Sequence, residues 1–231
     1  MAQSPSTLHV FKAIARGRFI YLLAFLFLSV LLFPFVEEAT YGPPIMQVVY
    51  SFMFISALYA VAAVRWIFRI GILLFVAALS SRWWIILSLS PMAVVVGIIF
   101  EIIFFCFVAL SLLSNVFGHE QVSGDTIAGA VCVFFLIGII SALAYQGIYF
   151  FNHRAFNNIA AGSFSPAATV DLVYYSFATL TTLGYGDITP ISKVARMIAV
   201  TEALVGQIYL TVLVARLVGL YAPVRSPRAG Q

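Results

Sequence analysis

The heptapeptide TTLGYGD at residues 181–187 decides the fold of this chain, because it lies between two long apolar stretches. Gly184 and Gly186 permit backbone angles that a β-carbon denies to other residues. Irregular backbone at membrane depth is tolerated only where protein buries it or where it lines a water-filled path. A row of carbonyl groups, together with a threonine hydroxyl, can replace the hydration shell of a monovalent cation. The heptapeptide therefore predicts irregular backbone that is either buried in protein or lines a water-filled path.

The composition agrees with a membrane location. Of the 231 residues, 63% are hydrophobic and only 9% are charged, whereas about a quarter of the residues in soluble domains are charged. The net charge of +4 does not require a nucleic-acid partner, because basic residues gather at the cytoplasmic ends of membrane spans. The two cysteines lie in apolar runs, and the three histidines lack the spacing of metal ligands. We therefore expect an all-α protein of the lipid bilayer with no cofactor and no transition-metal site.

Six apolar stretches are candidates for membrane-spanning helices, at residues 19–36, 45–64, 66–80, 84–114, 126–150 and 194–220. A spanning helix needs about 20 mainly apolar residues. We expect residues 81–83 to separate the third span from the fourth. The fourth stretch would be about 46 Å long as one helix, against a hydrocarbon core of about 30 Å. It therefore tilts, bends near Pro91, or continues along the cytoplasmic interface.

The distribution of basic residues predicts the orientation. Counting the fourth stretch once gives six spans with both termini in the cytoplasm. Of the 12 lysines and arginines, this topology places two thirds inside and one third outside, with Arg82 in the outer group, as the positive-inside rule requires. We expect a multi-pass protein of the cell (inner) membrane, with residues 181–187 facing the outside.

The last two spans and the segment between them follow a recognisable order. An apolar span is followed by a polar loop, a short helix candidate at 169–181, the TTLGYGD strand and a second apolar span. In this order, and in the strand itself, the chain resembles the tetrameric potassium channel superfamily, with Leu183 where that family usually has valine. The resemblance implies a re-entrant pore helix at 169–181 followed by a selectivity filter. A glycine-rich loop without an ion path is the alternative.

The resemblance also implies which groups bind the permeant ion. K⁺ would be coordinated by the backbone carbonyls of Thr182, Leu183, Gly184 and Tyr185 and by the Thr182 hydroxyl, while Gly186 completes the strand. The carbonyl end of the pore helix would face the cavity below the filter, where its partial negative charge favours a cation.

Three further residues are expected to support the filter. Tyr174 and Tyr175 stand where many members of the superfamily carry paired tryptophans that form an aromatic cuff. The Tyr174 hydroxyl can donate a hydrogen bond to Asp187 and so brace the strand. Ala178 stands where some members have a glutamate that pairs with this aspartate. The alternative is that both tyrosines are ordinary interfacial aromatics.

Four residues of the inner helix are candidates for a hinge or for the cavity. Gly206 falls where the superfamily often has a glycine hinge, and a small residue that permits close helix packing is an equal alternative. Glu202, one turn earlier, either lines the cavity or pairs with a helix behind it. Gln207 and Thr211 are candidates to face the pore. Glu101, in the fourth stretch, is expected to pair within the bundle.

These expectations divide the chain into four parts: a cytoplasmic N-terminus (1–18), a four-span bundle (19–125), the pore domain (126–220) and a cytoplasmic tail (221–231). The fourth span lacks the basic residues that a voltage sensor moves, so we expect weak or absent voltage dependence. The tail is too short for a soluble regulatory domain. One chain supplies one filter loop, whereas four surround an ion, which predicts a homotetramer with cyclic symmetry.

The sequence therefore predicts passive, potassium-selective conduction. Two other transport functions stay open, namely a poorly selective monovalent cation channel and a subunit of a potassium uptake transporter. We do not expect an enzyme, because the sequence offers neither a buried nucleophile with a base nor a metal cluster.

Overall fold

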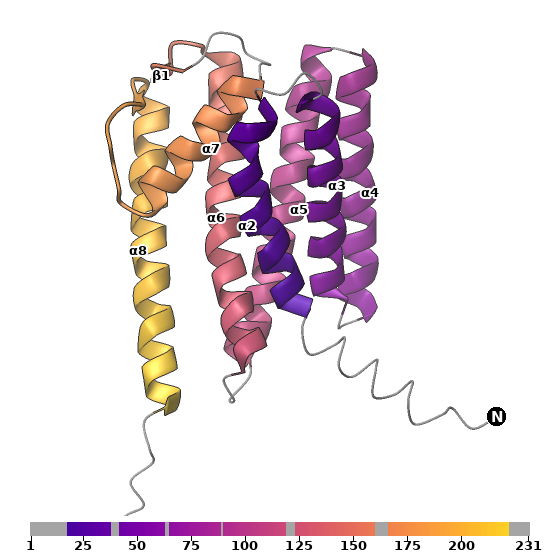
Figure 1. Ribbon diagram of the computed structural model, residues 1–231, viewed down its shortest axis with the longest axis vertical. Helices are drawn as coiled ribbons and strands as arrows, with labels where there is room; N and C mark the ends of the chain where they lie inside the picture. The colour runs from indigo at the N-terminus through magenta and orange to yellow at the C-terminus, as the bar shows by residue number, and fades with distance from the viewer. Residues whose placement is uncertain are drawn as a thin grey trace, which may run out of the picture.

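The computed structural model describes residues 18–37, 42–62, 65–88, 90–118, 123–159 and 166–221. Its helices are α2 (Arg18–Glu37), α3 (Gly42–Val61), α4 (Arg65–Ser88), α5 (Pro91–Gly118), α6 (Gly124–Phe151), α7 (Pro166–Leu180) and α8 (Lys193–Tyr221) (Figure 1). Two short strands, β1 (Phe156–Asn157) and β2 (Thr189–Pro190), pair antiparallel. The TTLGYGD segment connects α7 to β2 and belongs to neither a helix nor a β-strand of the structure; it is still called the TTLGYGD strand below.

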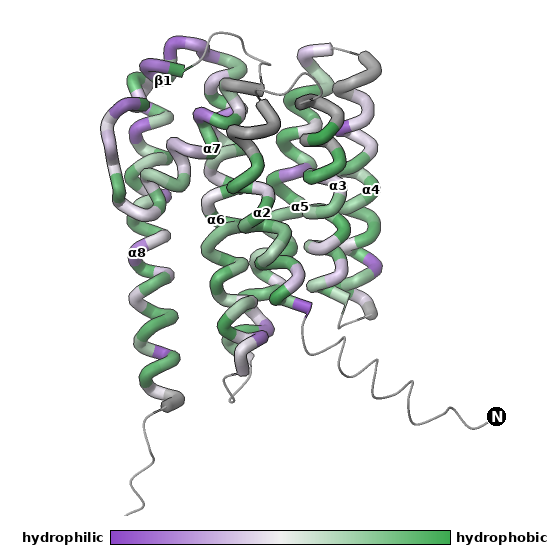
Figure 2. Tube along the Cα trace, viewed as in Figure 1, coloured by the Kyte–Doolittle hydropathy of each residue, from purple (hydrophilic) through white to green (hydrophobic). Residues whose placement is uncertain are grey.

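The long helices lie side by side with similar axis directions, and the shorter α7 lies at one end of this array (Figure 1). Hydrophobic residues extend along the helices, while hydrophilic residues gather near β1 (Figure 2). Among the described residues, the four helices α4, α5, α6 and α8 are long and apolar enough to cross a membrane. α2 and α3 contribute shorter apolar stretches, Arg18–Leu32 and Val48–Val61. The chain is therefore a helical membrane protein.

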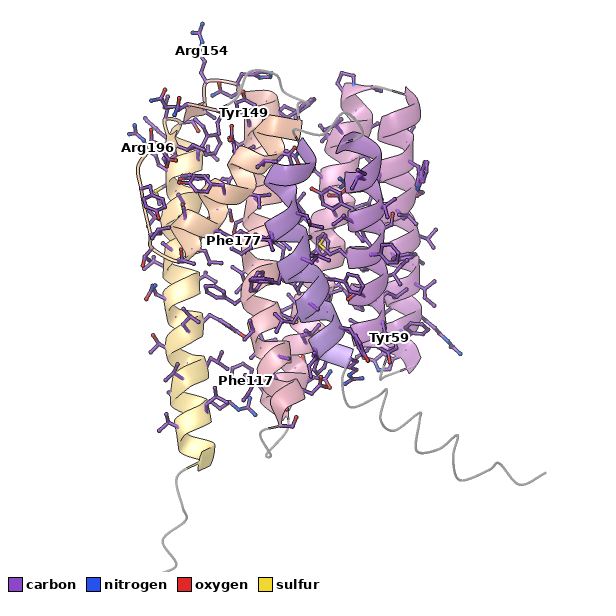
Figure 3. The ribbon with its side chains drawn as sticks, viewed as in Figure 1. Tyr59, Phe117, Tyr149, Arg154, Phe177 and Arg196 are labelled. Carbon is purple, nitrogen blue, oxygen red and sulfur yellow. The ribbon has the colours of Figure 1, made fainter. Side chains whose placement is uncertain are left out.

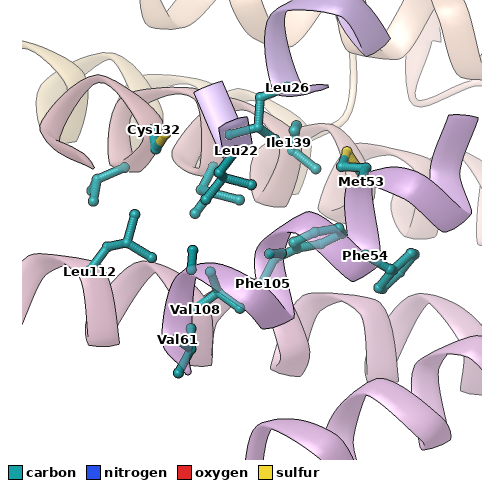
Figure 4. Close-up of a cluster of buried hydrophobic side chains, with 14 of the residues drawn as sticks. Leu22, Leu26, Met53, Phe54, Val61, Phe105, Val108, Leu112, Cys132 and Ile139 are labelled. Atoms are coloured by element: carbon teal, nitrogen blue, oxygen red, sulfur yellow. The ribbon is translucent and has the colours of Figure 1, made fainter. Parts of the chain in front are cut away.

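The largest buried cluster joins α2, α3, α5 and α6 (Figure 4). At its centre, the ring of Phe54 lies 5.1 Å from that of Phe104 and 5.0 Å from that of Phe105, measured between centroids. Leu22 and Leu26 of α2 are fully buried in the same cluster. This packing holds α2, α3 and α5 against α6. α6 in turn packs against α7 and α8.

The boundary that we expected at residues 81–83 is wrong. α4 continues through them to Ser88, and the chain leaves the helical conformation before Pro91, where α5 begins. Proline suits the first position of a helix, because its missing N–H has no partner there and its φ is already helical. The third span is therefore longer, and the fourth starts later, than the apolar pattern predicts. A change of direction near Pro91 was one of the alternatives for the long fourth stretch.

Arg82 lies within α4 and does not mark the end of a helix, although its charge had led us to expect one there. Its Nη1 lies 2.5 Å from Oε1 of Glu101 on α5, and its guanidinium carbon lies 3.7 Å from the centroid of the Tyr50 ring. The expectation that Glu101 pairs within the bundle is confirmed, whereas the expectation that a helix ends beside Arg82 is wrong. An intramembrane charge commonly pairs with another inside a bundle, so a basic residue in an apolar run does not always mark an interface.

The start of α2 and the end of α8 lie at the same end of the molecule (Figure 1). The Arg18 guanidinium donates to the Asn115 side chain, and the Arg216 guanidinium lies 4.6 Å from the centroid of the Phe117 ring. Figure 3 places Phe117 near this lower end, and Tyr149, Arg154 and Arg196 near the opposite end. Residues 152–159, which include β1, therefore lie at the end of the bundle away from Arg18.

Candidate functional site

The backbone of the TTLGYGD strand alternates in conformation. φ is +58° at Thr182, +56° at Gly184 and +79° at Gly186, while Leu183 and Tyr185 are not among the residues with positive φ. The sign of φ therefore alternates from residue to residue between Thr182 and Gly186. Glycine adopts positive φ at little cost, but threonine does so rarely. Thr182 must therefore be held by its surroundings.

The end of α7 supplies that restraint. The Thr182 N–H donates to the Thr179 carbonyl at 3.0 Å. The N–H groups of Leu183 and Gly184 both donate to the Ala178 carbonyl, at 2.9 and 3.2 Å. The helix end and the start of the strand thus form one hydrogen-bonded unit. The negative end of the α7 dipole also lies at this junction.

The other end of the strand is held through Asp187. The Tyr174 hydroxyl donates to Asp187 Oδ2 at 2.8 Å, so the predicted Tyr174–Asp187 hydrogen bond is present. This bond is the main cause that lowers the pKa of Asp187 below its ordinary value. The Asn158 side-chain amide donates to the Asp187 carbonyl at 3.2 Å. Asp187 is therefore held both by α7 and by the segment that precedes α7.

Asn158 is a contact that the sequence analysis missed. It follows β1 with φ of +61°, a conformation that asparagine tolerates better than most residues. β1 pairs with β2 in the register Phe156 to Pro190 and Asn157 to Thr189, which brings Asn158 beside the end of the TTLGYGD strand. The Asn157-Asn158 pair was the available signal, but its partner could not be read from sequence.

The two predicted tyrosines occupy different environments. Tyr174 is 37% exposed and bonds to Asp187, whereas Tyr175 is 6% exposed. The Tyr175 ring lies 5.1 Å from that of Tyr145 and 5.4 Å from that of Phe156, with edge-to-face geometry. Within one chain, Tyr175 therefore anchors α7 against α6 and β1.

Two glycines on neighbouring helices permit the close approach of α7. A β-carbon at Gly206 of α8 would lie 2.7 Å from Leu180 Cδ1 and 2.9 Å from the Leu180 carbonyl oxygen. A β-carbon at Gly138 of α6 would lie 2.9 Å from Cζ of Phe177. Gly206 thus has a packing role at the last residue of α7. Gly138 is a second position of this kind, and the sequence analysis did not identify it.

Glu202 lies on the same face of α8 as Gly206 and is only 3% exposed. Its Oε2 lies 2.5 Å from the Tyr145 hydroxyl of α6, and its Oε1 lies 2.5 Å from the Ser176 hydroxyl of α7. Of the two expectations for Glu202, pairing with helices behind it is the one that the contacts match. Gln207 and Thr211 lie on the exposed face of α8. The four inner-helix candidates therefore divide into a packed pair and an exposed pair.

The ion-binding candidates are exposed in the single chain. Every residue from 181 to 187 is exposed, including Leu183 at 55% and Tyr185 at 69%. On α8, large apolar side chains such as Leu204 and Ile208 are exposed by 57% and 61%. In the described part of the chain, no group of three or more His, Cys, Asp or Glu side chains could hold a metal ion.

Comparison with known proteins matches this region. Residues 133–222 match a protein-family model described as an ion channel. A 48-residue stretch, 21% of this chain, is 54% identical to Protein LctB of Bacillus caldotenax. That match spans 35% of the relative's length. No solved structure matches the chain. The family match supports the ion channel superfamily for this part of the chain, and with it ion transport rather than enzymatic catalysis.

Proposed function

We propose that this chain is the subunit of a potassium-selective channel that conducts passively. The observation that carries the proposal is the alternating sign of φ along residues 182–186, next to the carbonyl end of α7. In this account, the carbonyls of Thr182, Leu183, Gly184 and Tyr185, with the Thr182 hydroxyl, replace the hydration shell of K⁺. Gly186 lets the strand continue to Asp187. The match of residues 133–222 to an ion channel family is independent support.

The proposed assembly is a homotetramer. One strand offers carbonyls on one edge, and an ion in a filter is surrounded by four such strands. The exposure of residues 181–187 and of apolar side chains on α8 suits surfaces that neighbouring copies cover. Native mass measurement is expected to give four copies of a 25.3 kDa chain. A stable, conducting monomer or dimer would contradict this assembly.

In the membrane, we propose six spans, α2, α3, α4, α5, α6 and α8, with α7 entering from one side and returning as the strand. The start of α2 and the end of α8 lie toward the same end of the molecule, away from α7 (Figure 1). The excess of basic residues near those ends favours a cytoplasmic location for both termini in the inner membrane. Residues 19–125 then form a bundle beside the pore domain (126–220), and opening depends weakly or not at all on voltage.

A liposome flux assay with two alanine variants tests the function. Gly184→Ala places a β-carbon at φ of +56°, a conformation that costs an L-residue about 1–2 kcal/mol. Gly147→Ala is the matched control, because its β-carbon would meet only Ile98 Cγ2 at an ordinary 3.9 Å. We expect selective K⁺ flux from wild type and Gly147→Ala, and loss of selectivity or flux in Gly184→Ala.

The same assay separates the alternatives. Equal K⁺ and Na⁺ flux through wild-type protein would favour the poorly selective cation channel. Saturable transport by a single chain would favour the transporter subunit. Unchanged selective flux in Gly184→Ala would count against the strand as the ion path.

A further inference from the structure

The number of protons available to the oxygens around Glu202 can be compared with the number of short contacts between those oxygens. The Ser176 hydroxyl oxygen lies 2.7 Å from the Gly138 carbonyl oxygen and 2.5 Å from Glu202 Oε1. A serine hydroxyl has one proton to donate, and a backbone carbonyl has none. Three oxygens therefore stand in a row, Gly138 O, Ser176 Oγ and Glu202 Oε1, with two short contacts between them.

Only one protonation state places a proton in both contacts. If Glu202 were ionised, the Ser176 proton could lie in one contact, and the other would bring two unprotonated oxygens to hydrogen-bond distance. If Glu202 is a neutral acid, its O–H donates to Ser176 Oγ and the Ser176 O–H donates to the Gly138 carbonyl. The Tyr145 hydroxyl then donates to Oε2 at 2.5 Å. Every polar atom in the row is satisfied, as buried polar groups generally are.

The groups that face the carboxyl from α6 and α7 are hydroxyls, and none of them carries a positive charge. From α6 it faces the hydroxyls of Tyr145 and Ser141, and from α7 it faces the hydroxyl of Ser176 and interacts electrostatically with Tyr175. On its own helix, the preceding arginine, Arg196, donates its Nε to the Pro190 carbonyl instead. None of the hydrogen bonds or ion pairs found for Glu202 in the described part of the chain involves a basic side chain. A buried carboxylate without a cation would be costly.

We propose that Glu202 is held as a neutral carboxylic acid and serves as a positioning residue that ties the inner helix α8 to the pore helix α7 and to α6. Its contacts lie one turn from Gly206, which packs on the last residue of α7. The position of α8 is thereby transmitted to the helix end that restrains Thr182. The consequence for conduction rests on the proposed channel function, whereas the protonation state does not.

Infrared spectroscopy tests the protonation state directly, in purified protein at neutral pH. The wild-type spectrum minus that of Glu202→Gln should contain the carbonyl band of one protonated carboxyl group per chain. Ser176→Ala removes the acceptor of the acid O–H, so the same band should shift to the frequency of a more weakly bonded acid. A wild-type spectrum that lacks this band, or a Ser176→Ala variant that shifts only carboxylate bands, would overturn the proposal.

Flux measurements test the positioning role. Glutamine places an amide donor group and an acceptor oxygen where the neutral acid has its O–H and C=O, so Glu202→Gln should retain K⁺ flux and selectivity within about twofold. Glu202→Leu leaves Ser176 and Tyr145 without their partner, and K⁺ flux should fall by roughly tenfold or more. If Glu202→Leu does not assemble, Ser176→Ala replaces it and should lower the flux in the same direction. Equal damage by glutamine and leucine would refute a neutral acid, even if infrared spectra were ambiguous. Absence of K⁺ flux in wild type would refute the channel function alone and leave the infrared result standing.

Discussion

The backbone conformation of Thr182 could not be predicted from the identity of the residue. The two glycines of TTLGYGD predict positive φ at their positions, because glycine adopts positive φ freely. Threonine prefers extended backbone, so nothing local predicts φ of +58° at Thr182. The conformation follows from the bond between its N–H and the Thr179 carbonyl at the end of α7. The candidate ion ligands could thus be named from the sequence, but the restraint on the first of them could not.

The bond between Tyr174 and Asp187 predicts a response to acid. This bond lowers the pKa of Asp187 below its ordinary value, which is about 3.9. Its stabilising contribution is therefore complete above that value and is lost as the pH falls through the lower, folded-state pKa. In Tyr174→Phe the pKa of Asp187 should return toward its ordinary value, so K⁺ flux should fail at a higher pH than in wild type.

Tyr21→Phe is the control for this measurement, because Tyr21 is 55% exposed on α2, away from Asp187. Acid profiles of K⁺ flux should coincide for wild type and Tyr21→Phe. If the profile of Tyr174→Phe also coincides with them, the hydrogen bond does not brace the strand.

Among the helices, the bounds of the last two spans and of the short helix between them were predicted more accurately than those of α4 and α5. The expected helix at 169–181 corresponds to α7, and the expected spans at 126–150 and 194–220 correspond to α6 and α8. The boundary at 81–83 was wrong because the charge of Arg82 is neutralised inside the bundle by Glu101. Contacts such as Leu180 against Gly206 depend on distant segments meeting, which a single sequence does not reveal.

The contact between α8 and α7 predicts different outcomes for two glycines of one helix. Gly206→Ala would place a β-carbon 2.9 Å from the Leu180 carbonyl oxygen, and Gly219→Ala would meet nothing within 4 Å in the described chain. Overpacking typically costs about 1–3 kcal/mol, so we expect Gly206→Ala to lower both the thermal stability of the assembly and its selectivity. Gly219→Ala should be neutral or stabilise by up to about 1 kcal/mol.

Removal of Leu180 Cδ1 should not rescue Gly206→Ala fully, because the backbone carbonyl stays in place. Thermal unfolding of Gly206→Ala, Gly219→Ala and the double variant Gly206→Ala with Leu180→Ala checks this. Equal behaviour of the two single variants would show that loss of glycine flexibility, rather than the contact with α7, governs α8.

For the molecule as a whole, the helices before α6 form a bundle with little charge to move. Arg82 and Glu101 are opposite charges held together, so movement of their helices as a unit carries no net charge through the field. Each elementary charge that crosses the field is worth about 2.3 kcal/mol per 100 mV, and a steep response needs on the order of ten charges per tetramer. In symmetric solutions free of divalent cations, open probability should change only gently between strongly negative and positive potentials. A steep conductance–voltage curve would mean that this bundle carries gating charge.

The reversal potential of single-channel current in a planar bilayer, with K⁺ and Na⁺ varied independently, tests potassium selectivity most directly. If residues 181–187 form a potassium filter, the reversal potential should shift by about 59 mV for each tenfold change in the K⁺ gradient. It should stay constant when the Na⁺ gradient is changed at fixed K⁺. A reversal potential that follows Na⁺ as closely as K⁺, or that ignores the K⁺ gradient, would contradict the account.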